Sequence, residues 1–354
     1  MLLFSLTQSG VRAGLGWGLM SVTQVMDRLY QINVPTPFKV GPVNCYLSIG
    51  DPITLIDTGP LHADTRAKLN AGLKEIGVTR SDIQRIIVTH AHSDHYGLAA
   101  EIVRDSNAEV WTHRYNRSTL EAHEADRQRR SEFYWQIMIE AGVPDEERQR
   151  LADSRHGGER FAESVKIDRT IDEGDKIEFA HKHWQVYHTP GHAGGLIVLF
   201  DPVSRVLLSN DHLLRDISSN PVVEPAPEGG PRPHRLVEYI YHLQRMIELK
   251  PVVAWTGHGD PVRDVAKLVK QRLAFHSRRA EKIIDLLGAA DRHLHRNAEQ
   301  CGSAYALAEP LFGRLNGIDS FLALSETIGH LEWLQEQGRV TSIEREGVVY
   351  WRRL

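Results

Sequence analysis

The sequence of 354 residues predicts an α/β domain followed by a smaller α+β domain. Short apolar runs typical of buried strands recur along the first part of the chain, together with a helical pattern at residues 235–249. Beyond about residue 270 the pattern changes to amphipathic helices and one hairpin. We therefore expect a poorly defined N-terminal extension at residues 1–25, a large domain at 26–265 and a C-terminal domain at 270–354.

Several of the strand-like runs end at a histidine or an aspartate. Glycines at several of these turns let the backbone bend sharply beside a crowded site. Because loops held by a rigid sheet often carry functional side chains, we expect these residues to gather in one place. The runs and the residues that follow them are 54–56 with Asp57, 86–88 with His90, 184–188 with His192, 206–209 with Asp211, and 251–255 with His258.

The second of these runs leads into the segment Thr89 to His95, which places four potential metal ligands within six residues. His90 and His92 are two positions apart and can converge on one point from an extended segment. Asp94 and His95 follow a turn and can point to a second place nearby. The segment predicts a site for two metal ions, with zinc as the default and iron or manganese also suited to these ligands. The alternative is a polar loop that is merely rich in histidine.

The five blocks, in this order, resemble the metallo-β-lactamase-fold hydrolase superfamily over about residues 27–265. This resemblance implies an αββα sandwich. It also implies that Asp57 supports the site from outside the ligand set. The implied ligands are His90, His92 and His192 for the first metal, and Asp94, His95 and His258 for the second, with Asp211 bridging the two.

The implied chemistry is hydrolysis by a metal-bridging hydroxide. Metal binding brings the pKa of a bridging water toward about 7, so hydroxide is available at neutral pH. We expect Asp94 to be catalytic as well as a ligand, because it can accept a hydrogen bond from the nucleophile and orient it. Many true β-lactamases of this fold lack a bridging aspartate at the position of Asp211, so antibiotic hydrolysis is not the expected native role.

A helical insertion is expected at about residues 115–161, between the second and third blocks. The spacing of Phe133, Ile137 and Met138 suits an amphipathic helix. The insertion is either a helical pair packed over the sheet or a lid that shapes the substrate pocket, and its apolar content favours an acyl or aryl group. Three further residues are candidates for the pocket, with a packing role as the competing interpretation: Tyr96, His188 and His212.

The C-terminal pattern predicts helices at residues 262–287 and 319–338 and a hairpin that turns at Glu346-Gly347. This order resembles a winged helix, which several subgroups of the superfamily carry, including relatives of the lactamase-β-2 endoribonuclease. The charges are evenly mixed, and the recognition-like helix holds glutamates at 326, 332 and 336. A surface that binds the phosphate backbone of nucleic acid would instead carry clustered lysines and arginines. The domain is expected instead to pack on the catalytic domain, to cover one side of the pocket or to mediate homodimerisation.

Composition limits the class of protein. The net charge of -4 gives no basic signature of a nucleic-acid binder. The two cysteines, Cys45 and Cys301, make a disulfide scaffold improbable, which fits a reducing, cytoplasmic location. No apolar run reaches the length of a membrane-spanning helix, and the first 25 residues lack the positive start and long apolar core of a signal peptide.

Two functions from different classes follow. The first is a zinc-dependent hydrolase of a small-molecule thioester, ester or lactone. The second is a metal-dependent endoribonuclease or phosphodiesterase that uses the C-terminal domain to hold nucleic acid. The apolar insertion and the absence of a basic cluster favour the first.

Overall fold

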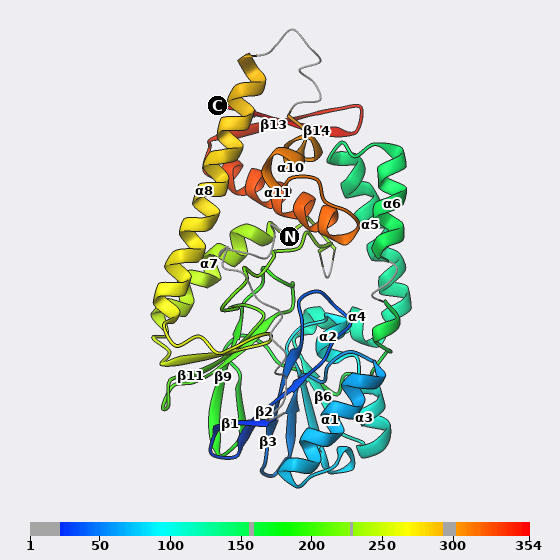
Figure 1. Ribbon diagram of the computed structural model, residues 1–354, viewed down its shortest axis with the longest axis vertical. Coiled ribbons are helices and arrows are strands. Elements are labelled where there is room, and N and C mark those ends of the chain that lie inside the picture. Colours follow the sequence, from blue (N-terminus) through cyan, green and yellow to red (C-terminus); the bar gives the residue numbers. More distant parts are fainter. Residues whose placement is uncertain (1–21, 156–158, 227–228, 293–301) are drawn as a thin grey trace, which may run out of the picture.

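The computed structural model describes residues 22–155, 159–226, 229–292 and 302–354 (Figure 1). Two β-sheets pack face to face, and helices cover the outer face of each, as the predicted αββα sandwich requires. The first sheet has the order β1 (Val22–Met26), β2 (Leu29–Val34), β3 (Val43–Ser48), β4 (Thr54–Ile56), β5 (Arg85–Val88), β6 (Glu109–Thr112) and β7 (Arg169–Thr170). The second has the order β12 (Val253–Thr256), β11 (Val206–Asn210), β10 (Ile197–Asp201), β9 (Lys182–His188) and β8 (Lys176–Phe179).

The N-terminal boundary differs from the prediction. An extension without defined structure was expected up to residue 25, but β1 starts at Val22 and pairs antiparallel with β2. Residues 1–21 lie outside the described part of the chain. The edge strand escaped prediction because its burial is partial and its apolar alternation is weak.

The central strands are apolar on both sides because both of their faces are covered. In β5, Ile86 packs with the helices outside the first sheet, whereas its neighbour Ile87 points into the layer between the sheets. The outer layers are α1 (Ala63–Ile76) and α3 (Ala99–Ser106) on the first sheet, and α7 (Arg235–Glu248) with the start of α8 (Val265–Arg292) on the second (Figure 1).

The insertion forms three helices, α4 (Arg117–Glu121), α5 (His123–Glu140) and α6 (Asp145–Arg155). The helical prediction is confirmed, and its apolar residues pack as one of the two interpretations expected, although against other helices and not over the sheet. Ile137 and Met138 are buried in a cluster with α8 and the C-terminal helices, and Phe133 packs against that cluster. These side chains therefore stabilise the fold instead of offering an apolar surface to a substrate.

The C-terminal elements are α10 (Ala304–Phe312), α11 (Ile318–Glu336) and a hairpin of β13 (Val340–Arg345) and β14 (Val348–Arg353). The hairpin turns at Glu346 and Gly347, as predicted, and both residues have positive φ, as a tight type I′ turn requires. The likeness to a winged helix stays a prediction.

Helix α11 is a core helix. It packs against α6, α7, α8 and α10, and Leu331 and Leu334 are fully buried. Two of its glutamates point inward, where Glu326 pairs with Arg279 and Glu332 pairs with Arg232. The acidic residues that the sequence placed on a recognition-like helix are thus mostly internal ion-pair partners.

Helix α11 also supports a loop of the larger domain. The Ser325 hydroxyl accepts a hydrogen bond from the Val223 amide at 2.7 Å and donates one to the Pro221 carbonyl at 3.3 Å. Val223 itself is buried in the same cluster as α11. The C-terminal helices and the loop after β11 therefore share one core.

The composition also led to expectations about the cysteines and about membrane-spanning helices. Cys45 lies buried on β3 as a free thiol, while Cys301 falls outside the described residues. Among the helices that the structure describes, none combines the length and the apolar character needed to cross a bilayer.

The substitution Leu331→Ala tests whether α11 belongs to the main core. Leu331 has no exposed surface, so the cavity should lower the free energy of unfolding by about 2–5 kcal/mol, measured by urea denaturation. Val203→Ala is the matched control, because Val203 is 85% exposed and its loss should cost less than about 0.5 kcal/mol. Equal effects of the two substitutions would contradict this packing.

Candidate metal centre

The strand ends named in the sequence meet at one edge of the sandwich. Asp57 follows β4, His90 follows β5, Asp211 follows β11 and His258 follows β12. A one-turn helix, α2 (Ser93–Tyr96), carries Asp94 and His95. The structure brings all seven expected ligands together in three overlapping groups of donors within 4.8 Å of one another: His90, His92 and His192; His90, His95 and Asp211; and Asp94, His95 and His258.

The first group consists of three imidazoles. The Nδ1 atom of His92 lies 3.0 Å from the Nε2 atom of His90 and 3.0 Å from the Nε2 atom of His192. Burial lowers the pKa of all three rings, that of His92 to about 3, so they are neutral at physiological pH. Neutral rings with converging nitrogens present lone pairs to a common point, which is the arrangement a metal ion needs.

Asp211 lies between the two sets of imidazoles. Its Oδ2 atom is 3.5 Å from the Nε2 atoms of His95, His192 and His258 alike. The Nε2 atom of His258 is also 3.4 Å from Oδ2 of Asp94. The Asp211 carboxylate is thus equidistant from histidines of both groups.

The outer ring nitrogens are held by the surrounding protein. The Nδ1 atom of His95 is 2.8 Å from Oδ2 of Asp57, and that of His258 is 2.8 Å from the Pro42 carbonyl. The Nδ1 atom of His192 is 3.2 Å from the Asn220 carbonyl. Because a carboxylate or carbonyl accepts a hydrogen bond from Nδ1–H, each ring turns its Nε2 atom into the site.

Asp57 has the supporting position that the resemblance implies. Besides His95, it accepts hydrogen bonds from the Thr89 amide at 2.9 Å and the Thr89 hydroxyl at 2.8 Å. It is fully buried, and its backbone has a positive φ of 57°. Asp57 thereby fixes both the end of β5 and the ring of His95.

Gly257 makes room for the site. A Cβ atom at this position would lie 2.0 Å from Oδ1 of Asp211 and 3.0 Å from Cε1 of His95. The residue before His258 must therefore be a glycine if the last ligand is to reach the cluster.

The carboxylates and imidazoles balance one another's charge. Burial opposes the charged form of His95, but Asp211, Asp57 and Asp94 together raise its pKa well above the ordinary value. Burial likewise opposes the charge on His258, and Asp211 and Asp94 raise its pKa. The same contacts hold the pKa values of Asp94 and Asp211 well below the ordinary range, although burial alone would raise them.

The donor set fits divalent metal ions. The Nε2 atoms of His95 and His258 and the Oδ1 atom of Asp211 are buried, and the described residues give them no hydrogen-bond partner. Buried polar atoms of this kind are costly unless something satisfies them. Imidazole and carboxylate ligands suit zinc, iron or manganese, and a cation would satisfy all three atoms.

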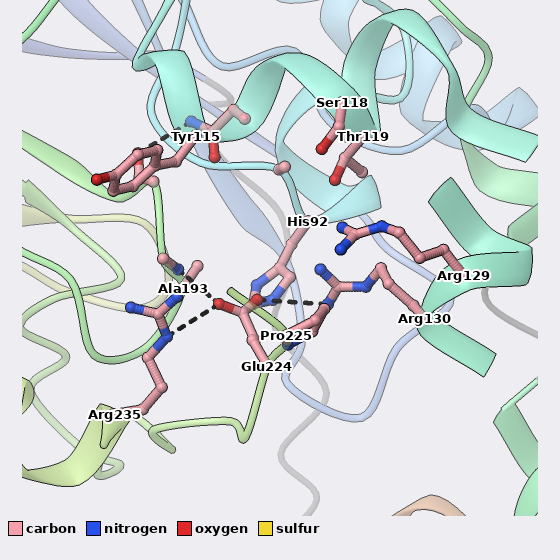
Figure 2. A pocket seen from close by; sticks show the side chains of 14 residues that line it. His92, Tyr115, Ser118, Thr119, Arg129, Arg130, Ala193, Glu224, Pro225 and Arg235 are labelled. Atoms are coloured by element: carbon pink, nitrogen blue, oxygen red, sulfur yellow. Dashed lines mark hydrogen bonds and ion pairs between the residues drawn. The ribbon is translucent and has the colours of Figure 1, made fainter. Parts of the chain in front are cut away.

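Beside His92 lies a small pocket, part of it open to solvent (Figure 2). Its walls come from the turn after β5, the glycines after His192, the start of the insertion, helix α5 and the loop after β11. Glu224 and Arg235 both line this pocket, although their sequence pattern did not predict them as site residues. An acidic residue within a proline-rich apolar stretch was the available signal for Glu224.

The three residues expected near the pocket are absent from its lining. The buried Tyr96 hydroxyl is 2.7 Å from Nδ1 of His123. His188 stacks on His113 with ring centroids 3.9 Å apart, and its Nε2 atom is 2.8 Å from the Gly194 carbonyl. His212 is fully buried and meets Tyr239 edge-on at 5.4 Å. These positions correspond to the packing interpretation.

A second buried group of donors joins α8 to α11. His276, Glu326 and His330 lie close enough to share an ion, with Nδ1 of His276 3.3 Å from Nε2 of His330. Arg279 already pairs with the Glu326 carboxylate, however, and a cation would face that positive charge. This group acts as a polar network within the helical core.

Comparison with known proteins decides the family. The sequence profile of the metallo-beta-lactamase superfamily matches residues 38–258, a span that contains every ligand candidate. The chain belongs to the metallo-beta-lactamase superfamily. A relative from Bacillus subtilis (strain 168), described as the probable metallo-hydrolase YqjP, is 33% identical over 325 residues, which cover 91% of this chain and 97% of that protein.

Solved structures agree with this assignment. A metallo-beta-lactamase family protein from Thermus thermophilus has a TM-score of 0.77 at 27% identity and covers 94% of this chain and 100% of its own. A beta-lactamase domain protein from Burkholderia ambifaria has a TM-score of 0.76 at 23% identity and covers 94% of each chain, which shows the common fold. These matches cover more of the chain than the superfamily profile does, so the likeness in fold extends beyond residues 38–258.

Metal loading should release protons. Although burial opposes it, the neighbouring carboxylates raise the pKa values of His95 and His258, and a ring that holds a proton on Nε2 must lose it to coordinate a metal. Zinc titration near pH 7 in a weakly buffered solution should therefore release protons, and the apparent affinity should fall as the pH is lowered.

The control for this measurement is Asp57→Asn. It removes one of the carboxylates that raise the pKa of His95, so fewer protons should be released on loading. Zinc binding with no proton release in the unsubstituted protein would contradict the charge balance described above.

Proposed function

We propose that this protein is a dinuclear metal-dependent hydrolase of small-molecule thioesters, esters or lactones. In this proposal His90, His92 and His192 hold one ion, and Asp94, His95 and His258 hold the other. The observation that carries it is the position of Asp211, whose Oδ2 atom lies 3.5 Å from imidazoles of both sets. Zinc is the proposed metal, because its preferred ligands are imidazole and carboxylate donors of this kind.

When bound, the metal ions supply Lewis acidity toward the scissile carbonyl and lower the pKa of a water molecule. The protein's own residues orient the reactants. Asp94 is ionised at neutral pH, and 13% of its side chain is exposed at the site. Its carboxylate can therefore accept a hydrogen bond from the attacking water and direct it toward the substrate.

The geometry of α11 favours a small-molecule substrate over RNA. A winged helix reads nucleic acid with an exposed helix, but α11 is enclosed by α6, α7, α8 and α10. Its glutamates at 326 and 332 form ion pairs with Arg279 and Arg232, so these cations are not available to phosphates.

A relative from Caenorhabditis elegans, named a beta-lactamase-like protein 2 homolog, is 23% identical over 72% of this chain and 68% of that protein.

The ligand assignment is tested by Asp211→Ala and His92→Ala. Each should lose bound metal, measured by elemental analysis, together with at least about a hundredfold of the esterase or thioesterase rate. His183→Ala is the matched control, because His183 is an exposed histidine on β9 that faces away from the site. Full activity in a metal-depleted Asp211→Ala protein would contradict the assignment.

The substrate class is tested by assaying the zinc-loaded chain on acyl thioesters, lactones and single-stranded RNA. We expect turnover of one or more of the carbonyl substrates and no cleavage of RNA. Cleavage of RNA without any ester, thioester or lactone turnover would replace this proposal with the nuclease.

A further inference from the structure

The pocket beside His92 has more cationic than anionic groups on its walls (Figure 2). Arg129, Arg130 and Arg235 line it, and Glu224 is the carboxylate among its lining residues. The hydroxyl-bearing side chains of Ser118 and Thr119 complete the side formed by the insertion. The pocket adjoins a proposed metal ligand, so a group bound there would belong to the molecule whose bond is cleaved.

Arg235 has a structural role. Its Nε atom lies 3.2 Å from Oε2 of Glu224, and its Nη1 atom donates to Glu238 at 2.7 Å. Its side chain is buried, so two carboxylates already neutralise it. The Gly194 amide donates to the same Oε2 atom of Glu224 at 2.7 Å. Arg235 thus fixes Glu224, and Glu224 fixes the backbone two residues after His192.

Arg130 is only partly neutralised. Its Nη2 atom lies 3.3 Å from Oε1 of Glu224, the carboxylate that it shares with Arg235, and donates to the Tyr134 hydroxyl at 2.9 Å. A guanidinium has five N–H donors, and both of these contacts use the same nitrogen. The planar fork of Arg130 therefore keeps donor capacity for an acceptor in the pocket.

Arg129 adds a second guanidinium on the same side. Its Nη2 atom donates to Oδ1 of Asp126 at 2.7 Å, and Thr119 donates to the other oxygen of that carboxylate at 2.7 Å. Asp126 is buried outside the pocket lining and orients Arg129, whose side chain remains 44% exposed. Both guanidinium groups point from α5 toward His92 (Figure 2).

We propose that Arg129 and Arg130 form a subsite that binds an anionic group of the substrate, a carboxylate or a phosphate, while the scissile carbonyl lies at the metal cluster. This inference rests on the proposed hydrolase function and narrows its substrate class. Arginine suits the role because its fork matches the two oxygens of a carboxylate or phosphate. The subsite also replaces the apolar acyl pocket expected from the sequence, since Ile137 and Met138 are buried elsewhere.

The test compares substrate pairs that differ in one charged group, with the full-length zinc-loaded protein. One pair is the glutaryl thioester of N-acetylcysteamine and its neutral methyl ester. The other is an acetyl thioester of pantetheine with and without the 4′-phosphate. We expect kcat/KM for the charged member of one pair to exceed that of its neutral partner about tenfold or more, mainly through KM. The pair that shows the preference identifies the carboxylate or the phosphate.

Variants then locate the preference. Arg129→Gln and Arg130→Gln should each bring the charged-to-neutral ratio of kcat/KM toward one. Arg130→Lys should restore only part of it, because an ammonium keeps the charge but lacks the fork. Arg127→Gln is the matched control, since Arg127 lies on the same helix, pairs with Glu124 and is absent from the pocket lining. It should keep the ratio of the unsubstituted protein.

The outcomes separate this inference from the proposed function. Equal turnover of charged and neutral members in both pairs would overturn the anion subsite and leave the hydrolase standing. An unchanged ratio in the glutamine variants, with a lowered melting temperature, would show that the arginines only stabilise the fold. RNA cleavage without any thioester turnover would overturn both proposals.

Discussion

The buried carboxylate of Asp211 is the constraint on which the rest of the structure depends. A carboxylate removed from water is costly unless cations surround it, and its Oδ2 atom lies 3.5 Å from three imidazoles contributed by separate parts of the chain. Those contacts require strands from both sheets to end at one edge. They also require a glycine at position 257, where any Cβ would meet Asp211 at 2.0 Å. The sandwich has hydrophobic cores on both sides of each sheet. This rigid support keeps the opposing charges together in the interior, although each charged group would be better solvated in water.

The support extends into the C-terminal helices. His192 is oriented by the Asn220 carbonyl, and the loop that continues from Asn220 is fastened to α11 through Ser325. A buried valine of that loop, Val223, packs with α11 as well. The C-terminal region is thus continuous with the metal centre through a few residues, instead of being attached beside it. A helix packed in this way leaves little of its surface to enter a groove of nucleic acid, which supports the proposal of a small-molecule substrate.

The sequence predicted the features that depend on neighbours along the chain. The strand ends, the four potential ligands of residues 90–95 and the hairpin turn at Glu346-Gly347 are local patterns, and the structure reproduces each of them. Predictions that depended on distant partners fared worse. The periodicity of α5 shows that the helix has an apolar face but not that α8 and α11 cover it. Glu224 was missed for the same reason, since Arg130 stands 94 residues away and Arg235 belongs to another helix.

Glu224 connects the chemistry with the choice of substrate. Burial opposes its negative charge, but Arg235 and Arg130 lower its pKa, so the carboxylate stays ionised between the two guanidinium groups. The same carboxylate holds the Gly194 amide and thereby the turn that carries His192. The helical insertion, α7 and the turn that carries His192 therefore all contact the carboxylate of Glu224. The position of the proposed anion subsite and the position of a proposed metal ligand cannot change independently, because a shift in either would leave Glu224 or a buried arginine without its partner. In the proposed subsite, a substrate that engages the arginines would for this reason be held at a fixed distance from the metal cluster, and the insertion would contribute to its orientation as well as to its binding.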